Sequence, residues 1–431
     1  MLSAFASAFR TPDLRKKILF TLGLLALYRL GAVIPTPGVS YTNIQKCIDV
    51  VQDNSLYGLI NLFSGGALLQ LSVFALGIMP YITASIIIQL LVVVIPRLEA
   101  LKKEGQSGQA KLTQYTRYLT IGLAVLQSTT ILTLARSPGR LFQGCNEQLI
   151  PNQSIPLIIV MIITLTAGTG MIMWFGELIT DRGIGNGMSL LIFTSIIASM
   201  PGQFAKVYQT DGTFTLAIVA AVGLLVIAAV VYVEQAQRRI PVQYAKRMVG
   251  SKMYGGASTY IPLKVNMAGV IPVIFASSLL YIPQLIVTLS GSQSGWAQWV
   301  SRNLTNGSEP IYLVVYFLLI VFFAYFYVAI TFNPVEVADN MKQYGGFIPG
   351  IRAGKPTAEY LDYVLTRLTF PGSIYLAIVA IIPFIAFGGL GLGQSFLFGG
   401  TSLLIMVGVG LDTVKQVESQ LQQRNYEGFL R

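Results

Sequence analysis

Histidine is absent from the 431 residues. Ser-His-Asp catalysis, histidine metal ligation and histidine proton relays are therefore all excluded. Cysteine occurs only twice, at Cys47 and Cys145, which is too few for a disulfide framework or a thiolate metal site. A single Cys47–Cys145 bridge remains open, although two unpaired thiols are the preferred interpretation.

Charged residues are also scarce. They make up 11% of the chain, whereas a soluble domain usually carries about 25%. Hydrophobic residues make up 54%, and several uncharged runs approach or exceed the 18 residues that mark a membrane helix. The sequence therefore predicts a polytopic membrane protein. The first 17 residues, MLSAFASAFRTPDLRKK, are interpreted as a short amphipathic segment with a basic end and not as a cleavable signal peptide.

Hydrophobic runs predict ten membrane spans. They are Ile18–Ile34, Ser72–Ile95, Tyr118–Ala135, Pro156–Gly176, Met188–Met200, Phe214–Val233, Met267–Leu289, Ile311–Phe332, Ser373–Phe387 and Gly399–Leu411. The fifth, ninth and tenth runs are short, so each could instead be a buried or re-entrant helix.

Lysine and arginine are distributed unevenly around these spans. The two termini and the even-numbered connections hold 23 of the 29 cations, and the opposite side holds five. This asymmetry explains the net charge of +11 and predicts that both termini are cytoplasmic. Arg29 is the remaining cation; it lies within the first span, five residues from its end, and we expect its side chain to snorkel outward.

Ten spans divide into two sets of five, and an odd number makes the second set enter the membrane from the opposite side. This geometry permits an inverted repeat with a site between the halves, although no convincing sequence identity links them. Two long cytoplasmic connections, Glu234–Lys264 and Asn333–Phe370, are either solvated links or docking surfaces. The mixture of tyrosine and arginine in the first favours docking.

The segment NLFSGGALLQ, from Asn61 to Gln70, predicts a loose half-helix before the second span. Ten helical residues cover about 15 Å, half of a bilayer core of about 30 Å. Gly65 and Gly66 are expected to break this helix early and to make it easy to displace.

The spans contain almost no ionisable residues, which is unusual for an ion-coupled transporter. Glu177, Asp181 and Arg182 lie at one span end, and Glu234 lies at another. The segment RGIGNG, starting at Arg182, loosely resembles a phosphate-binding turn, but no strand precedes it, so it is expected to be a tight turn between spans.

Three functional classes follow from the residues. A passive channel and a secondary transporter are equally supported. A membrane-embedded hydrolase is disfavoured, because histidine is absent and no paired carboxylates lie within the spans. The apolar side chains between the halves could line an opening, or they could pack in the core or face lipid.

Long motifs in a fixed order carry a resemblance to a known family. They are IPTPGV (34–39), NLFSGGAL (61–68), SVFALGIMPYITASIIIQLL (72–91), KKEGQSGQ (102–109), QYTRY (114–118), ITDRGIGNG (179–187), RRIPVQYAKR (238–247), PLKVNMAGVIP (262–272), FNPVEVADN (332–340), FIPGIRAGKPT (347–357) and FGGTSLLI (398–405). Together they resemble the SecY/Sec61-alpha family, whose bacterial members are the central channel subunits of the Sec protein translocon.

The resemblance implies an all-α fold of ten transmembrane helices in two pseudo-symmetric inverted halves around an hourglass pore with a plug helix. The implied divisions are an N-terminus (1–17), a first half (18–200) with the plug (61–71), an external connection (201–213), a second half (214–411) with cytoplasmic loops (234–266 and 333–371), and a tail (412–431). The implied function is that of a channel for unfolded preproteins, which also releases signal sequences and membrane helices sideways into lipid.

The resemblance also implies roles for individual residues. The pore ring would be Ile78, Ile82, Met188, Ile192, Ile274 and Ile405. The plug would contain Asn61, Leu62, Phe63, Ser64, Gly65, Gly66, Ala67 and Leu68. The lateral gate would include Thr83, Gln89, Gln127 and Val270, and the docking residues would be Arg238, Arg239, Lys246, Arg247 and Arg352. Methionine at position 188 departs from the β-branched residues of the ring, so a softer seal is expected there.

Partners follow from the same resemblance: a SecE-like clamp, a SecG-like subunit, the SecA motor, the ribosome, the preprotein with its signal sequence, membrane lipid, and accessory proteins of the YidC and SecDF types. No cofactor, metal or enzymatic activity is implied. The expected location is the bacterial plasma membrane, with the thylakoid as a further location in a photosynthetic host.

Overall fold

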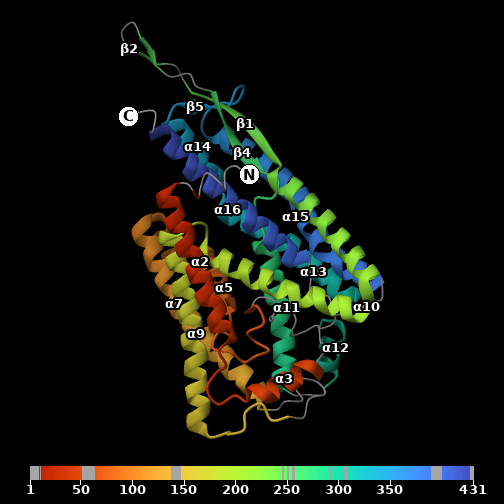
Figure 1. The fold of residues 1–431 in the computed structure, drawn as a ribbon. Coiled ribbons are helices and arrows are strands. Elements are labelled where there is room, and N and C mark those ends of the chain that lie inside the picture. The colour runs from red at the N-terminus through yellow and green to blue at the C-terminus, as the bar shows by residue number, and fades with distance from the viewer. Residues whose placement is uncertain are drawn as a thin grey trace.

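The structure, a computed structural model, is a long bundle of helices with a small β-sheet at one end (Figure 1). It describes residues 9, 11–50, 64–136, 147–244, 247–249, 252–254, 258–290, 294–304, 309–389 and 400–427.

The described helices of the first part of the chain are α2 (Pro12–Val33), α3 (Tyr41–Val50), α5 (Met79–Val94), α6 (Pro96–Lys103), α7 (Gln106–Ala135), α9 (Ile155–Arg182) and α10 (Gly187–Gln235). Proline occupies the first turn of α2, α5, α6 and α9, where its fixed φ suits a helix start and its missing N–H costs nothing. Helix α10 begins differently: the Asn186 side chain accepts hydrogen bonds from the amides of Met188 and Ser189.

The predicted RGIGNG turn is confirmed. Helix α9 ends at Arg182, Gly185 has a φ of 84°, and Asn186 caps the next helix. The hydroxyl of Thr21 on α2 accepts a hydrogen bond from the Ile184 amide, at 3.2 Å, which fastens the turn to the first helix.

The described helices of the second part are α11 (Ile271–Ser290), α12 (Gly295–Asn303), α13 (Pro310–Thr331), α14 (Pro334–Gln343), α15 (Lys355–Gly389) and α16 (Gly400–Glu427). The start of α2 and the later part of α16 lie at the same end of the molecule, where Leu14, Ile184 and Val417 form a small apolar cluster. Helices α3 and α12 lie at the other end (Figure 1).

Helices stand at all ten predicted span positions. Six described segments are long and apolar enough to cross a membrane, and a seventh is added if α5 and α6, bent by 100° against each other, count as one span. The six lie in α7, α9, the two parts of α10, α13 and α15. The predicted short spans are parts of longer helices, since α15 has 35 residues and α16 has 28.

The second predicted span is shorter than expected. The sequence predicts continuous crossing from Ser72 to Ile95, but helix α5 covers only Met79 to Val94. The preceding residues form turns held by backbone hydrogen bonds, including one from the Val73 amide to the Ile34 carbonyl at 2.9 Å. A tertiary contact with the end of α2 therefore overrides the local helical preference.

The predicted connection at 201–213 is helical, and its position outside the membrane stays a prediction. Helix α10 continues through it, and its one break is Gly212, with φ 81° and ψ 179°. This geometry is accessible to glycine but not to other residues, so the chain bends there into the second half.

The long connections contain strands that the sequence analysis did not predict. They are β1 (Gln237–Tyr244), β2 (Arg247–Val249), β3 (Lys252–Tyr254), β4 (Ser258–Lys264) and β5 (Gly346–Phe347). Strand β1 pairs antiparallel with β4, and also with β5 from the other long connection, where Gln243 faces Phe347. Alternate residues Ile240 and Val242 of β1 are buried. The fold is thus all-α within the spans and carries a small sheet outside them.

Cys47 on α3 is disulfide-bonded, so the preferred interpretation of two unpaired thiols is wrong. Cys145, the chain's other cysteine, lies outside the described residues. Helix α3 is also joined to the segment before α9: the Asn43 side chain donates to the Gln148 carbonyl at 2.8 Å, and Lys46 pairs with Glu147 at 3.7 Å.

Candidate functional site

One apolar cluster draws on both parts of the chain, and it is called the central cluster below. Its buried members are Leu24, Tyr28, Phe74, Ile78, Ile172, Phe175, Ile179, Leu190, Leu191, Ile192, Ile196, Ile274 and Ile405. Phe74 and Ile78 come from the turns before α5, and the other members come from helices α2, α9, α10, α11 and α16. Buried side chains of both halves therefore meet at one place.

All six residues assigned to the pore ring lie in or against this cluster. Ile78, Ile192, Ile274 and Ile405 are buried members, and Ile82 and Met188 are half-buried and packed against them. Ile78 and Ile82 are one helical turn apart at the start of α5, as are Met188 and Ile192 on α10, which directs each pair to one face. The structure brings these six residues together; their role in a pore stays a prediction.

Met188 has an additional contact. A Cβ added to Gly176 of α9 would overlap the Met188 sulfur, so this side chain packs directly on the backbone of α9. A flexible thioether suits such an irregular gap.

The turns between the plug segment and α5 contribute Phe74 to the central cluster. Phe74 stacks on Tyr28 with centroids 5.9 Å apart and meets Phe175 edge-on at 6.4 Å. A Cβ on Gly31 would overlap the Phe74 ring, so only glycine allows α2 to approach this closely.

Only part of the predicted plug is described. Asn61, Leu62 and Phe63 lie outside the described residues. Ser64 is helical, and residues 65–71 form turns. Gly65 and Gly66 have φ values of 65° and 94°, which is the geometry in which helices end. The predicted break at the glycines is therefore confirmed, and the easy displacement of the segment stays a prediction.

Arg29 has a partner that the sequence analysis did not predict. Its guanidinium is half-buried, and its Nη1 donates a hydrogen bond to the Gly65 carbonyl at 2.8 Å. A turn of the chain itself supplies this acceptor, and the outward snorkelling of the side chain stays a prediction. Beside it, the buried Tyr28 hydroxyl lies 2.6 Å from Ser195 Oγ on α10. The lone cation in an apolar span was the sequence signal for this site.

The predicted lateral-gate residues are less closely associated. Among the described residues, the hydrogen bonds of Thr83 and Gln89 stay within α5. Gln127 is half-buried on α7. Val270 packs against the central cluster and against the core of the second half. The role of these four residues in a lateral gate stays a prediction.

Three of the predicted docking residues lie on or near the β4–β1–β5 sheet. Arg238 and Arg239 are exposed on β1, and the Arg239 guanidinium lies 4.9 Å from the Tyr260 ring centroid. Arg352 is exposed near β5, and its carbonyl accepts from the Thr357 hydroxyl at 2.9 Å. Arg247 belongs to β2, and Lys246 lies outside the described residues.

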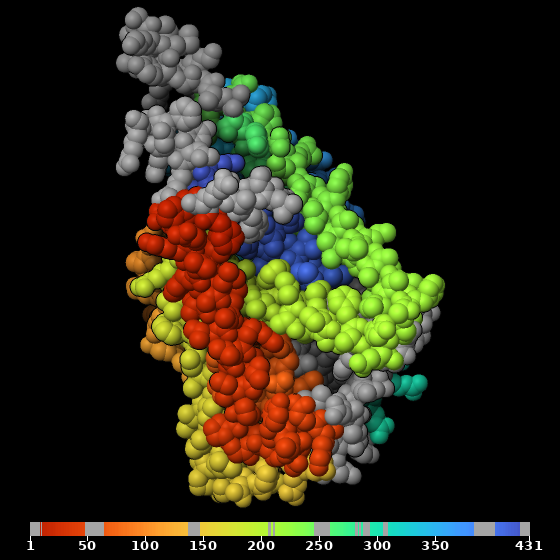
Figure 2. Space-filling view, viewed as in Figure 1, coloured from red at the N-terminus to blue at the C-terminus, as the bar shows by residue number. Residues whose placement is uncertain are grey.

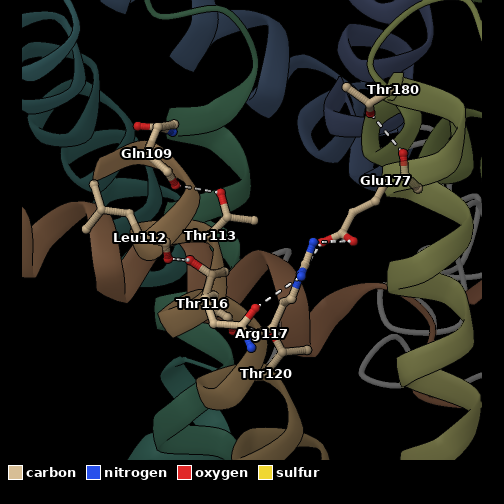
Figure 3. A network of polar contacts seen from close by, with 10 residues as sticks. Gln109, Leu112, Thr113, Thr116, Arg117, Thr120, Glu177 and Thr180 are labelled. Atoms are coloured by element: carbon tan, nitrogen blue, oxygen red, sulfur yellow. Dashed lines mark hydrogen bonds and ion pairs between the residues drawn. The ribbon is translucent and has the colours of Figure 1, made fainter. Parts of the chain in front are cut away.

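An ion pair that the sequence analysis did not predict joins α7 to α9 (Figure 3). Arg117 donates from Nε to Glu177 Oε1 at 2.7 Å and from Nη2 to Oε2 at 2.8 Å. Gln114 receives a third hydrogen bond from the same guanidinium, at 3.1 Å. Glu177 had been noted only as a charge at a span end, and the 60 residues between the partners give no local signal.

A second buried polar contact lies at the end of α10. Asn266 donates to the Glu234 carboxylate at 2.5 Å and to the Gly269 carbonyl at 3.2 Å. It connects the last turn of α10 to the start of α11. Within the described part of the chain, no group of three potential metal ligands occurs.

Comparisons with known proteins agree with this arrangement. The SecY family model matches residues 72–414. A protein translocase subunit SecY from Streptomyces scabiei is 65% identical over 438 aligned residues, which cover 100% of both chains. The subunit of the same name from Mycobacterium tuberculosis strain H37Rv is 60% identical over 442 residues, again covering 100% of both.

Solved structures share the fold. One described as "The structure of a protein conducting channel" gives a TM-score of 0.64 at 20% identity and covers 94% of this chain and 91% of its own. Another, "Sec61 in the Canine ribosome-channel complex from the endoplasmic reticulum", gives 0.60 at 19% identity with the same coverage. At these identities the likeness establishes the fold alone. With the family model and the end-to-end identity to its relatives, the chain belongs to the SecY family.

Proposed function

We propose that this multi-pass membrane protein is the channel-forming subunit of a protein translocase. Unfolded preproteins would pass between its two halves, and signal sequences and membrane helices would leave sideways into lipid. The observation that carries the proposal is the central cluster, in which isoleucines of α5, α10, α11 and α16 meet.

The chemistry of the cluster supports a seal that opens for a polypeptide. An apolar constriction excludes ions by dewetting and binds no particular side chain strongly. A chain of mixed sequence can therefore pass without being trapped. We propose the Ser64–Leu71 turn as the base of the plug. It directly precedes Phe74 and Ile78 of this cluster in the chain, and its Leu68 and Leu71 pack in the core of the first half.

The division of the chain supports two halves that can separate. Separate apolar cores lie in the first part, around α3, α7 and α9, and in the second, around α11, α13 and α15. We propose that residues 18–200 and 214–411 are these halves, with the seam at the lateral gate formed by α5 and α7 against α11 and α13.

The β4–β1–β5 sheet is proposed as the docking surface for a motor ATPase of the SecA type and for the ribosome. Arg238, Arg239 and Arg352 are exposed around it, and arginine pairs equally well with carboxylates and with RNA phosphates. SecE-like and SecG-like subunits are proposed as further partners.

We propose that the sheet and both termini face the cytoplasm of the bacterial plasma membrane. The charge asymmetry supports this orientation, because the termini and the even-numbered connections hold 23 of the 29 cations. The common end of α2, α16 and the sheet in Figure 1 is consistent with it.

A stalled preprotein tests the pore. It would carry a photo-crosslinker midway along its translocating segment, and the chain would be reconstituted with its small subunits and the motor. We expect crosslinks at Ile82, Ile192 and Ile274. Leu126 and Leu318, which are exposed on α7 and α13, serve as lipid-facing controls. Efficient transport with crosslinks only to lipid-facing positions or to partner subunits would contradict the proposal.

A further inference from the structure

Arg29 is a cation in the middle of an apolar surface. It lies on α2, between Tyr28 and Leu30, and the helix has its remaining Lys and Arg side chains in its first two turns. Arginine is costly within a membrane span, and such residues usually serve a function. The described structure gives Arg29 one side-chain hydrogen bond, to the Gly65 carbonyl at 2.8 Å.

The acceptor suits a cation. Ser64 is helical and Gly65 has a φ of 65°, so the helix ends here. Carbonyls at the end of a helix lack intrahelical partners and carry the negative end of the helix dipole. The guanidinium therefore satisfies a group that neither lipid nor the apolar cluster could satisfy.

The fit around this bond is close. A Cβ on Gly65 would lie 2.7 Å from Arg29 Nη1 and 3.1 Å from Ser195 Cα, so the turn touches both α2 and α10. The beginning of α10 meets α2 on the face in Figure 2. Ser195 Oγ donates to the Leu191 carbonyl, so the Tyr28 hydroxyl is the donor in their 2.6 Å contact. Tyr28 and Ser195 thereby fix the surface on which the turn rests.

The Ser64–Leu71 turn is fastened at two places. At its base, the Thr36 amide and hydroxyl both donate to the Leu71 carbonyl, at 3.0 and 2.7 Å. At its beginning, the contact with Arg29 joins it to α2, while a Cβ on the neighbouring Gly66 would meet no atom within 4 Å. Loss of the guanidinium would remove this contact at the beginning of the turn and leave the base attached.

We propose that Arg29 is a positioning residue that holds the Ser64–Leu71 turn against α10 and thereby stabilises the closed channel. The inference rests on the proposed function, because it assigns this turn to the base of the plug. Arg29 touches no translocating chain; it acts through the position of the turn.

The resting ion conductance of the reconstituted complex tests this inference. Arg29→Met keeps the length of the side chain but removes the donor, and Arg29→Lys keeps the charge with different geometry. We expect Arg29→Met to raise the resting conductance on the order of tenfold, because a hydrogen bond to a charged group contributes that factor or more. Arg29→Lys should give a smaller increase. Arg15→Met, at an exposed position of the same helix, is the matched control and should match the unmodified chain.

A double substitution separates positioning from general damage. Gly65→Ala introduces a side chain at a φ of 65° and against Arg29, so it should also raise the conductance. If Arg29 acts through the turn, Arg29→Met combined with Gly65→Ala will conduct no more than Gly65→Ala alone. If the increase in conductance of the double variant is the product of the two single increases, Arg29 acts elsewhere and the inference is overturned.

Transport provides an independent measurement. A preprotein with a weakened signal sequence supplies less energy for opening, so a channel biased toward the open state should transport more of it. We expect Arg29→Met to increase this transport several-fold over the unmodified chain. Unchanged conductance and unchanged transport in Arg29→Met would refute the positioning role. If that variant does not assemble, the conductances of Arg29→Lys and Gly65→Ala replace it: raised conductance supports the positioning role, and unchanged conductance in both refutes it.

The outcomes also separate this inference from the proposed function. Preprotein crosslinks absent from the central cluster of the unmodified chain would refute the channel assignment whatever Arg29 does. Crosslinks present in the cluster, together with normal conductance in Arg29→Met, would refute only the role of Arg29.

Discussion

The Arg117–Glu177 pair allows a quantitative prediction about how the first half is held together. Two parallel hydrogen bonds, at 2.7 and 2.8 Å, connect α7 to α9, and Gln114 binds the third edge of the guanidinium. Hydrogen bonds to charged groups contribute about 1.5–3 kcal/mol, whereas exposed ion pairs contribute about 0–1 kcal/mol. The Arg117 side chain is 40% exposed and the Glu177 side chain 21% exposed, so solvent screens the pair in part. We therefore expect a coupling energy of about 1–2 kcal/mol.

A double-mutant cycle measures this coupling. Glu177→Gln, Arg117→Gln and the double variant would be purified in the assembled complex, and their free energies of unfolding compared. Each single substitution should destabilise the protein, and the double variant should be less destabilised than the sum. The coupling should fall only slightly in high salt, because partly buried charges are screened less than exposed ones.

Lys103 and Glu99 on α6 provide the matched control. Their charged atoms are also 2.7 Å apart, but the side chains are 75% and 52% exposed. Lys103 lowers the pKa of the Glu99 carboxyl, so this pair is charged at neutral pH. We expect no measurable coupling for it. Additive effects at Arg117 and Glu177, or equal coupling in the two pairs, would refute the argument that burial and bidentate geometry decide the energy.

Three further predictions concern the channel and its docking surface. Met188→Ile should lower the resting ion leak, because a β-branched side chain is stiffer than methionine; an unchanged leak would count against a softer seal. Arg352→Glu should abolish motor-driven transport while the complex still assembles, whereas Lys355→Glu, also exposed nearby, should transport normally; normal transport in Arg352→Glu would remove this residue from the docking surface. Gly31→Ala should lower the free energy of unfolding by about 1–3 kcal/mol, because the new methyl group overlaps the Phe74 ring; an unchanged unfolding transition would mean that the ring moves freely.

Much of the fold could be predicted because its signals are local. The apolar runs predict ten helices, and helices occur at all ten positions. The turn at Arg182–Gly187 could be predicted from its glycines. The six isoleucine and methionine positions of the pore ring came from the family resemblance, and they do lie together in one cluster.

Two of the differences from the sequence analysis concern contacts between distant segments. The beginning of the second span is held in turns by Ile34 of α2, so its helical preference is overridden. The two long connections form one sheet because β1 pairs with β5, about a hundred residues later. No periodicity in either segment by itself indicates that pairing.

Arg29 illustrates the difference between what the sequence determines and what only the tertiary structure determines. The sequence by itself determined that this chain spans a membrane, where its helices lie and that one cation stands among apolar residues, because hydrophobic length and charge are local properties. Only the tertiary structure decided that this cation binds the Gly65 carbonyl, that Arg117 pairs with Glu177 and that Tyr28 meets Ser195, 167 residues away. A buried polar group must find a partner wherever the packed helices bring one within about 3 Å, and that distance exists only once the whole chain has folded.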